Sequence, residues 1–160
     1  MSAGDNRLSN LEEATVAELQ RAMTAGELSA VELARYYLDR IRDLDQGGPR
    51  VNSVLEVNPE ALALAAQLDD ERRTRGPRGP LHGIPILVKD NIDTGDKMTT
   101  TAGSLALEGS HADKDAFVVK RLRDAGAIML AKVNLGELAN GFESSLGGQS
   151  LNPHDLTRTP

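Results

Sequence analysis

The sequence contains no cysteine and no tryptophan, and only 2% of its 160 residues are aromatic. The absence of cysteine excludes disulfide bonds, zinc–thiolate sites and thiol catalysis. Because aromatic residues are scarce, the hydrophobic core must be built from aliphatic side chains, chiefly Leu, Val, Ile and Ala. Hydrophobic residues still make up 39% of the chain, which predicts a folded globular protein rather than a disordered one.

Excess positive charge and long apolar runs are also lacking. The chain has 18 Lys and Arg against 24 Asp and Glu, a formal net charge of −6. This balance argues against a nucleic-acid groove or an anionic membrane surface, because both attract basic proteins. No stretch is apolar for the length of a membrane span, and the polar start from Met1 to Ala14 is unlike a secretory signal. We therefore expect a cytoplasmic protein that binds neither membranes nor, directly, nucleic acid.

Two helices are predicted near the start of the chain. Thr15 and Ser29 each stand three residues before a glutamate, which is the capping-box pattern of a helix N-terminus. Gly26 is predicted to end the first helix, and Gly47-Gly48-Pro49 the second. Apolar residues recur at helical spacing, at Val16, Leu19 and Met23 in the first helix and at Val31, Ala34, Leu38, Ile41 and Leu44 in the second.

The next segments alternate between strand and helix patterns. A strand is predicted over residues 51–57, and a helix over residues 59–75 follows it. Short apolar runs at 84–88 and 127–131 predict two buried strands. Between them lies an amphipathic helix over residues 115–125, with Val118, Leu122 and Ala125 expected to face inward. A helix between two such strands is typical of the α/β fold class.

Lys89 stands at the exit of the 84–88 strand, followed by Asp90, Asp93 and the small polar stretch 99–104. In open α/β sheets, functional groups gather at the carboxyl ends of the strands. A lysine at the edge of an apolar crevice is partly neutral and can act as a general base, whereas nearby Asp90 and Asp93 favour its charged form. A lysine that simply reaches solvent fits the same pattern. The aspartates and residues 99–104 fit either a substrate-facing loop or a turn.

Other candidate sites have weaker patterns. His82, His111 and His154 are far apart and lack ligand spacing, so we expect no metal. Residues 147–150 lack the pattern of a phosphate-binding loop, and no GxGxxG motif follows either apolar strand. We therefore expect no cofactor. Four serines are candidate nucleophiles that lie in no GxSxG elbow, namely Ser104, Ser144, Ser145 and Ser150.

Taken together, these segments resemble the amidase signature family from about Thr15 to Pro160. The most specific matches are residues 80–85 leading into 88–91, and then 101–104. Residues 131–139 are similar to the family's GKTN…EFA segment, with Ala131 in place of glycine and Val133 in place of threonine. Residues 158–160 are similar to the approach to its serine- and glycine-rich signature. The resemblance implies a mixed central sheet flanked by helices, with two leading helices, and a metal-independent hydrolase of small carboxamides.

The resemblance also implies roles for individual residues. Lys89 is expected to be the lysine of a Ser–cisSer–Lys triad, which takes a proton from the cis-serine so that this serine deprotonates the nucleophile. Leu138, Ala139 and Asn140 lie where family members line the substrate cleft, so we expect them to contact substrate. In the family the two serines follow the segment that matches 158–160, whereas this sequence ends at Pro160. Residues 1–160 are therefore expected to be a partial domain that is inactive alone.

Several interpretations stay open at this point. The first is the N-terminal part of a free-standing amidase, and the second is the glutaminase subunit of a tRNA-dependent amidotransferase. A third is a truncated, non-catalytic product that binds or regulates a full-length amidase, and a fourth is an α/β binding domain that shares only the fold. A homo-oligomer is compatible with each, because uncovered sheet edges and apolar helix faces promote association.

Overall fold

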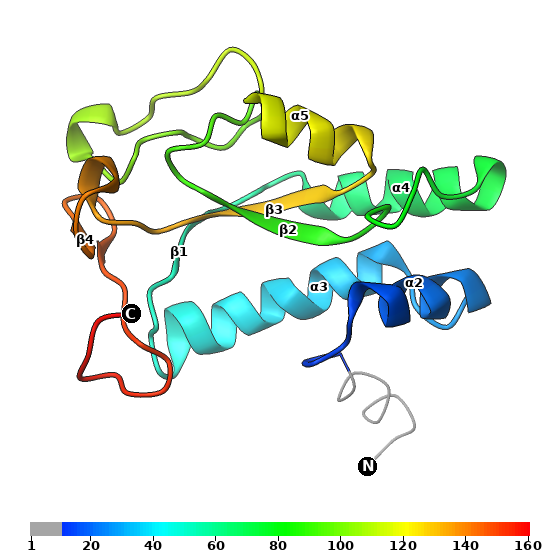
Figure 1. Ribbon diagram of the computed structural model, residues 1–160, viewed down its shortest axis with the longest axis horizontal. Coiled ribbons are helices and arrows are strands. Elements are labelled where there is room, and N and C mark those ends of the chain that lie inside the picture. Colours follow the sequence, from blue (N-terminus) through cyan, green and yellow to red (C-terminus); the bar gives the residue numbers. More distant parts are fainter. Residues whose placement is uncertain (1–10) are drawn as a thin grey trace.

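The computed structural model describes residues 11–160 as helices packed on both faces of a small sheet (Figure 1). Figure 1 shows α2 and α3 below the sheet and α5 above it. Within the described part of the chain, no helix has the length and apolar character needed to cross a membrane. The helices are α2 (Val16–Ala25), α3 (Ala30–Arg40), η1 (Ile41–Gly47), α4 (Ala61–Arg75), η2 (Leu105–Leu107), α5 (Phe117–Asp124) and η3 (Glu137–Ala139), and the strands are β1 (Val54–Val57), β2 (Pro85–Lys89), β3 (Ile128–Val133), β4 (Glu143–Ser144) and β5 (Gly148–Gln149).

Both predicted capping boxes are confirmed. The Thr15 side chain accepts a hydrogen bond from the backbone N–H of Glu18, and the Glu18 carboxylate accepts one from the Thr15 N–H. The same reciprocal pair joins Ser29 and Glu32 at the start of α3. Gly26 ends α2 in the left-handed conformation, with φ of 72°. The two leading helices therefore begin and end where local sequence chemistry places them.

The second predicted helix changes its geometry before its end. After Arg40 the chain continues as the wider π-helical turns of η1, which shift the direction of each following side chain. Leu44 is consequently 40% exposed, so the prediction that it faces inward was wrong. Asp45 is buried instead, and its carboxylate accepts hydrogen bonds from the N–H groups of Ser53 (2.7 Å) and Val54 (3.0 Å).

The central sheet is mixed, as expected, with strand order β1-β3-β2. β2 runs parallel to β3, and α5 connects them, whereas β1 is antiparallel to β3. The strand predicted over 51–57 forms only over its last four residues, because Asn52 takes a positive φ of 58° that breaks the extended chain. The helix predicted over 59–75 is α4, which begins two residues later, at Ala61.

The core lies on both faces of the sheet and is aliphatic, as the composition requires. One cluster joins α3 and α4 to β3, and a second joins α5 to β2 and β3. On α5 the buried residue is Val119, while Val118 is 49% exposed, so the prediction that Val118 faces inward was wrong. The reason is that α5 starts at Phe117 with Ala116 as its N-cap, which turns the row Ala116, Val119, Leu122 toward the sheet.

Thr94 offers a test of packing in the loop after β2. Its side chain is fully buried, and its hydroxyl finds no hydrogen-bond partner among residues 11–160. Because a buried polar group without a partner destabilises the fold, we expect Thr94→Val to raise the free energy of unfolding by about 1 kcal/mol in urea titration. Thr101→Val is the matched control, since the Thr101 hydroxyl is bonded to Asp90, and it should destabilise by about 1.5–3 kcal/mol. Destabilisation by Thr94→Val would contradict this account.

Candidate functional site

Lys89 lies at the carboxyl end of β2, where β2 and β3 end side by side. In the parallel register Lys89 pairs with Val133. The Lys89 side chain is exposed, and it forms no ion pair with any of residues 11–160. The loops that follow both strands leave from this edge, on the left of Figure 1. The structure thus brings residues 90–104 and 134–150 to the end of the strand that carries Lys89.

Asp90, the next residue, is 1% exposed and organises the 99–104 loop. Its carboxylate oxygen Oδ2 accepts hydrogen bonds from the backbone N–H groups of Thr101 (3.1 Å) and Gly103 (3.3 Å) and from the Thr101 hydroxyl. Its backbone carbonyl accepts another from the Ala102 N–H (3.2 Å). The stretch 99–104, for which sequence left two interpretations open, is therefore a turn folded back on the strand end.

Lys132 of β3 is fully buried beneath the same loop. Its ammonium group donates hydrogen bonds to the carbonyl oxygens of Ile92 (2.9 Å) and Thr99 (2.8 Å) and to the Thr100 hydroxyl (2.9 Å). Nζ also lies 3.6 Å from Oδ1 of Asp90, a buried ion pair. Burial lowers the pKa of Lys132, and the nearby Asp90 charge opposes part of that shift.

A β-bulge in β3 determines which way Lys132 faces. The pairing of β3 with β2 skips Leu130, which has no partner between Met129 and Ala131. Leu130 and Ala131 therefore both join the core cluster of α3 and α4. Lys132, the next residue, points to the other face, where it meets the loop after β2.

The expected substrate contacts lie in η3 and at its C-cap, Asn140, close to the 99–104 turn. The N–H of Leu138 donates to the carbonyl oxygen of Ala102 (2.9 Å), which joins the two segments directly. Leu138 and Ala139 take positive φ values of 53° and 65°, a conformation that is strained for residues with a Cβ. The Leu138 side chain is 66% exposed, and Ala139 and Asn140 are also exposed. All three can be reached from solvent at the edge of the sheet that carries Lys89.

Glu137 holds this turn to its neighbours. Its carboxylate accepts a hydrogen bond from the Ser104 hydroxyl (2.7 Å) and another from the backbone N–H of Ser145 (2.9 Å). The hydrogen bonds from Ser145 and Ser104 lower the pKa of Glu137 below its ordinary value. Ionised Glu137 therefore ties η3 to both the 99–104 turn and the β4–β5 hairpin.

We expect the stabilising effect of Glu137 to depend on pH. A carboxylate with a lowered pKa in the folded state stabilises above its unfolded pKa of about 4.3, and this contribution is lost as pH falls through the folded pKa. Glu137→Gln should therefore lower the unfolding midpoint most at neutral pH, and the difference from wild type should shrink below pH 4. Urea unfolding at several pH values measures this. Glu108→Gln, whose side chain forms no hydrogen bond within residues 11–160, should change the midpoint little, and a pH-independent loss in Glu137→Gln would contradict the prediction.

The serines and the buried histidine have structural partners. Ser144 donates to Oδ1 of Asn134 (3.1 Å), and Ser150 donates to the carbonyl of Asn52 (3.0 Å). His82 is buried, with Nε2 at 2.9 Å from the Leu68 carbonyl oxygen. Among the described residues no cluster of three or more His, Asp or Glu side chains could hold a metal ion.

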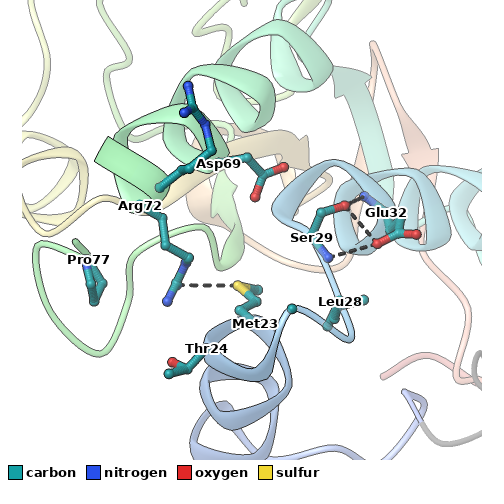
Figure 2. Close-up of a pocket in the computed structure, with 10 residues that line it drawn as sticks. Met23, Thr24, Leu28, Ser29, Glu32, Asp69, Arg72 and Pro77 are labelled. Atoms are coloured by element: carbon teal, nitrogen blue, oxygen red, sulfur yellow. Dashed lines mark hydrogen bonds between the residues drawn. The ribbon is translucent and has the colours of Figure 1, made fainter. Parts of the chain in front are cut away.

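A separate open pocket of about 490 Å³ lies among α2, α3 and α4 (Figure 2). Its polar side chains already bind neighbouring groups. The Asp69 carboxylate accepts a hydrogen bond from the N–H of Ala30 (2.7 Å), and Ser29 and Glu32 form the capping box of α3. The lining shares no residue with the segments around Lys89. We assign this pocket no function.

Sequence reasoning identified Lys89 but not the groups that organise its surroundings. The strand predicted over 127–131 stops just before Lys132, whereas Lys132 lies inside β3, among residues that are otherwise apolar. The sequence does indicate that the strand extends past Lys132, since the next residue, Val133, is again apolar and β-branched. No sequence pattern indicated the role of Glu137, because Ser104 lies 33 residues before it and Ser145 follows an irregular turn.

Comparison with known proteins identifies the family. The family model described as Amidase matches residues 32–160. A Schizosaccharomyces pombe protein named as an amidase is 47% identical, over 94% of this chain and 26% of its own length. A protein of Halorhodospira halophila, named as one of the subunits of glutamyl-tRNA(Gln) amidotransferase, is 45% identical, over 91% of this chain and 30% of its own length.

The fold agrees with these matches. The crystal structure of peptide amidase from Stenotrophomonas maltophilia superposes with a TM-score of 0.90 and 51% identity, over 93% of this chain and 32% of that chain. The sequence therefore spans about a quarter to a third of the length of the relatives that it matches. The family model covers well over half of the chain, and the relatives exceed 40% identity across nearly all of it. This chain belongs to the amidase family.

Proposed function

We propose that the complete protein is an amidase that hydrolyses carboxamides, and that Lys89 is the base of its Ser–cisSer–Lys triad. The observation that carries this proposal is the position of Lys89. It stands exposed at the carboxyl end of β2, beside the end of the central strand β3, where the loops that follow both strands meet. Such edges are where α/β proteins bind ligands.

The mechanism requires an amine that can accept a proton. Lys89 takes the proton of the cis-serine, and that serine in turn deprotonates the nucleophilic serine as it attacks the amide carbonyl. The acyl-enzyme that forms is then cleaved by water. Both serines would be supplied by the part of the protein that follows Pro160, where backbone N–H groups would also stabilise the oxyanion.

The neighbouring acid, Asp90, forms its ion pair with Lys132 and not with Lys89. Asp90 could have held the Lys89 ammonium group as an ion pair, but its carboxylate is buried and bound to Lys132, Thr101 and Gly103. Lys89 is thus left without a carboxylate partner among the residues that the structure describes. This arrangement supports the assignment of Lys89 as a base.

Leu138, Ala139 and Asn140 are proposed to form part of the wall of the substrate cleft. They are exposed, and a backbone hydrogen bond ties their turn to the loop that follows Lys89. The similarity to a peptide amidase favours peptide amides as the first substrates to examine. The proposed enzyme needs no cofactor and no metal, and we place it in the cytoplasm.

The direct test is ammonia release by the complete protein from a panel of carboxamides. The panel should include aliphatic amides, aromatic amides, peptide amides and glutamine. Hydrolysis of one class by the wild type, and none by Lys89→Ala, is the expected result. The proposal would be abandoned if the intact protein from its native source had the 17.1 kDa mass of this chain. A product of that size would instead be the truncated, non-catalytic partner of an amidase.

A second candidate function is the glutaminase component of a tRNA-dependent amidotransferase. The similarity to the amidotransferase protein of Halorhodospira halophila, at 45% identity, favours this alternative. A free-standing amidase hydrolyses its substrate alone, whereas a glutaminase component works within its assembly. Glutamine hydrolysis that appears only when the other amidotransferase subunits and tRNA are added would identify the second function.

A further inference from the structure

We propose that Lys132 is a positioning residue of the amidase site, acting through Asp90 and the 90–104 loop on the placement of Lys89. The proposal rests on the proposed function of Lys89. Its evidence is the arrangement of a fully buried lysine, a fully buried aspartate and a loop whose two ends both bind that lysine.

The burial of Lys132 is the first step. A lysine side chain is almost never fully buried unless it is paired, because the ammonium group loses its hydration. Lys132 is 0% exposed in a strand whose preceding residues form the aliphatic core. A methionine or leucine would fill this volume without that cost, so packing alone does not account for a lysine here.

The partners of Lys132 show what the charge does. Its three donated hydrogen bonds go to Ile92 at the beginning of the loop, and to Thr99 and Thr100 near its end. A single ammonium group thereby fixes the separation of two chain segments that enter and leave the loop. An apolar side chain offers no donor to either segment.

The link to Lys89 runs through Asp90. Oδ1 of Asp90 lies 3.6 Å from Lys132 Nζ, and Oδ2 accepts from the N–H groups of Thr101 and Gly103. Asp90 follows Lys89 directly, and its own N–H donates to the Val133 carbonyl (3.1 Å). The strand end that carries Lys89 is therefore held between β3 and a loop whose shape depends on Lys132.

The test compares Lys132→Met with wild type in the complete enzyme, at a temperature where both are fully folded. A misplacement of about 1 Å in a catalytic group lowers the rate about 100-fold, so we expect a loss of this size in kcat. The substrate is bound by other groups, and KM should stay within about threefold of wild type. Thr100→Val removes one acceptor of Lys132 without uncovering a charge. It should fold normally and lower kcat by several-fold.

Two further measurements separate positioning from general stability. Amide hydrogen exchange in residues 91–103 should accelerate in Lys132→Met at least about tenfold more than exchange in β3, because local opening is governed by local contacts whereas core strands follow global stability. Thr94→Val, in the same loop but without a hydrogen bond to Lys132, and Lys97→Met, an exposed lysine of that loop, should leave kcat unchanged.

The outcomes are distinct for the two proposals. If Lys89→Ala abolishes turnover but Thr100→Val and folded Lys132→Met keep wild-type kcat, the positioning role is overturned. Unchanged exchange in residues 91–103 would overturn it as well, even in a protein that hydrolyses no amide. If the wild type hydrolyses none of the amides tested while exchange accelerates as expected, Lys132 still positions the loop and the amidase assignment fails instead.

Discussion

Replacing Lys89 by alanine is expected to lower kcat of the complete enzyme by about 10²–10⁴-fold, the usual contribution of a positioned general base. Stability should change by no more than about 0.5 kcal/mol, because the Lys89 side chain is exposed and forms no ion pair within residues 11–160. Steady-state kinetics with the preferred amide, together with urea unfolding of both proteins, measures the two effects separately.

Two companion variants make the Lys89 experiment specific. Lys89→Arg keeps the positive charge, but a guanidinium group does not lose its proton at accessible pH, so this variant should be as inactive as Lys89→Ala. Lys97→Ala removes an exposed lysine of the following loop that pairs with Glu60, and it should retain wild-type kcat. Near-normal hydrolysis by Lys89→Ala would show that the triad assignment is wrong. Activity in Lys89→Arg would show that charge, rather than proton transfer, is what the site requires.

The second large effect is expected in the buried pair of Lys132 and Asp90. Removing one partner of a buried ion pair leaves an uncompensated charge and costs about 3–5 kcal/mol. We therefore expect Lys132→Met and Asp90→Asn each to lower the free energy of unfolding by about that amount. In the double variant neither of these two positions carries a charge, so its loss should be well below the sum of the two single losses.

A double-mutant cycle in urea measures this coupling. The exposed pair of Lys120 and Asp124 on α5, at 2.7 Å, provides the reference cycle. Exposed pairs four residues apart on a helix contribute about 0.3–0.5 kcal/mol, because solvent screens the charges. Additive losses at Lys132 and Asp90 would mean that the two groups do not form a pair in solution, and that Lys132 is stabilised by its hydrogen bonds alone.

Local sequence chemistry was sufficient for the elements that depend only on neighbouring residues. The capping boxes at Thr15 and Ser29 predicted the starts of α2 and α3, and the apolar runs predicted β2 and β3. The family motifs gave the mixed sheet and singled out Lys89, whose catalytic role is still a prediction. These signals are short in sequence and have an immediate physical cause.

The errors arose where the geometry of an element departs from the regular period of its segment, or where a distant part of the chain packs on it. The π-helical turns of η1 turned Leu44 outward, and the start of α5 exchanged the roles of Val118 and Val119. The bulge at Leu130 turned Lys132 under a loop that begins 40 residues earlier, at Ile92. None of these effects is encoded in the hydrophobic period of a single segment, so the organisation of the site became visible only in three dimensions.

The parallel pairing of β2 with β3 also bears on the order in which the molecule assembles. Ile128 pairs with Pro85, which lies 43 residues earlier, and the whole of α5 lies between them. Contacts of such sequence separation require closure of a long loop, and they form more slowly than the local turns of capped helices. We expect α2 and α3 to form early in folding and the edge that carries Lys89 to form among the last steps. Until that closure is complete, Lys132 has none of its acceptors and stays hydrated, so its burial coincides with the final assembly of the site.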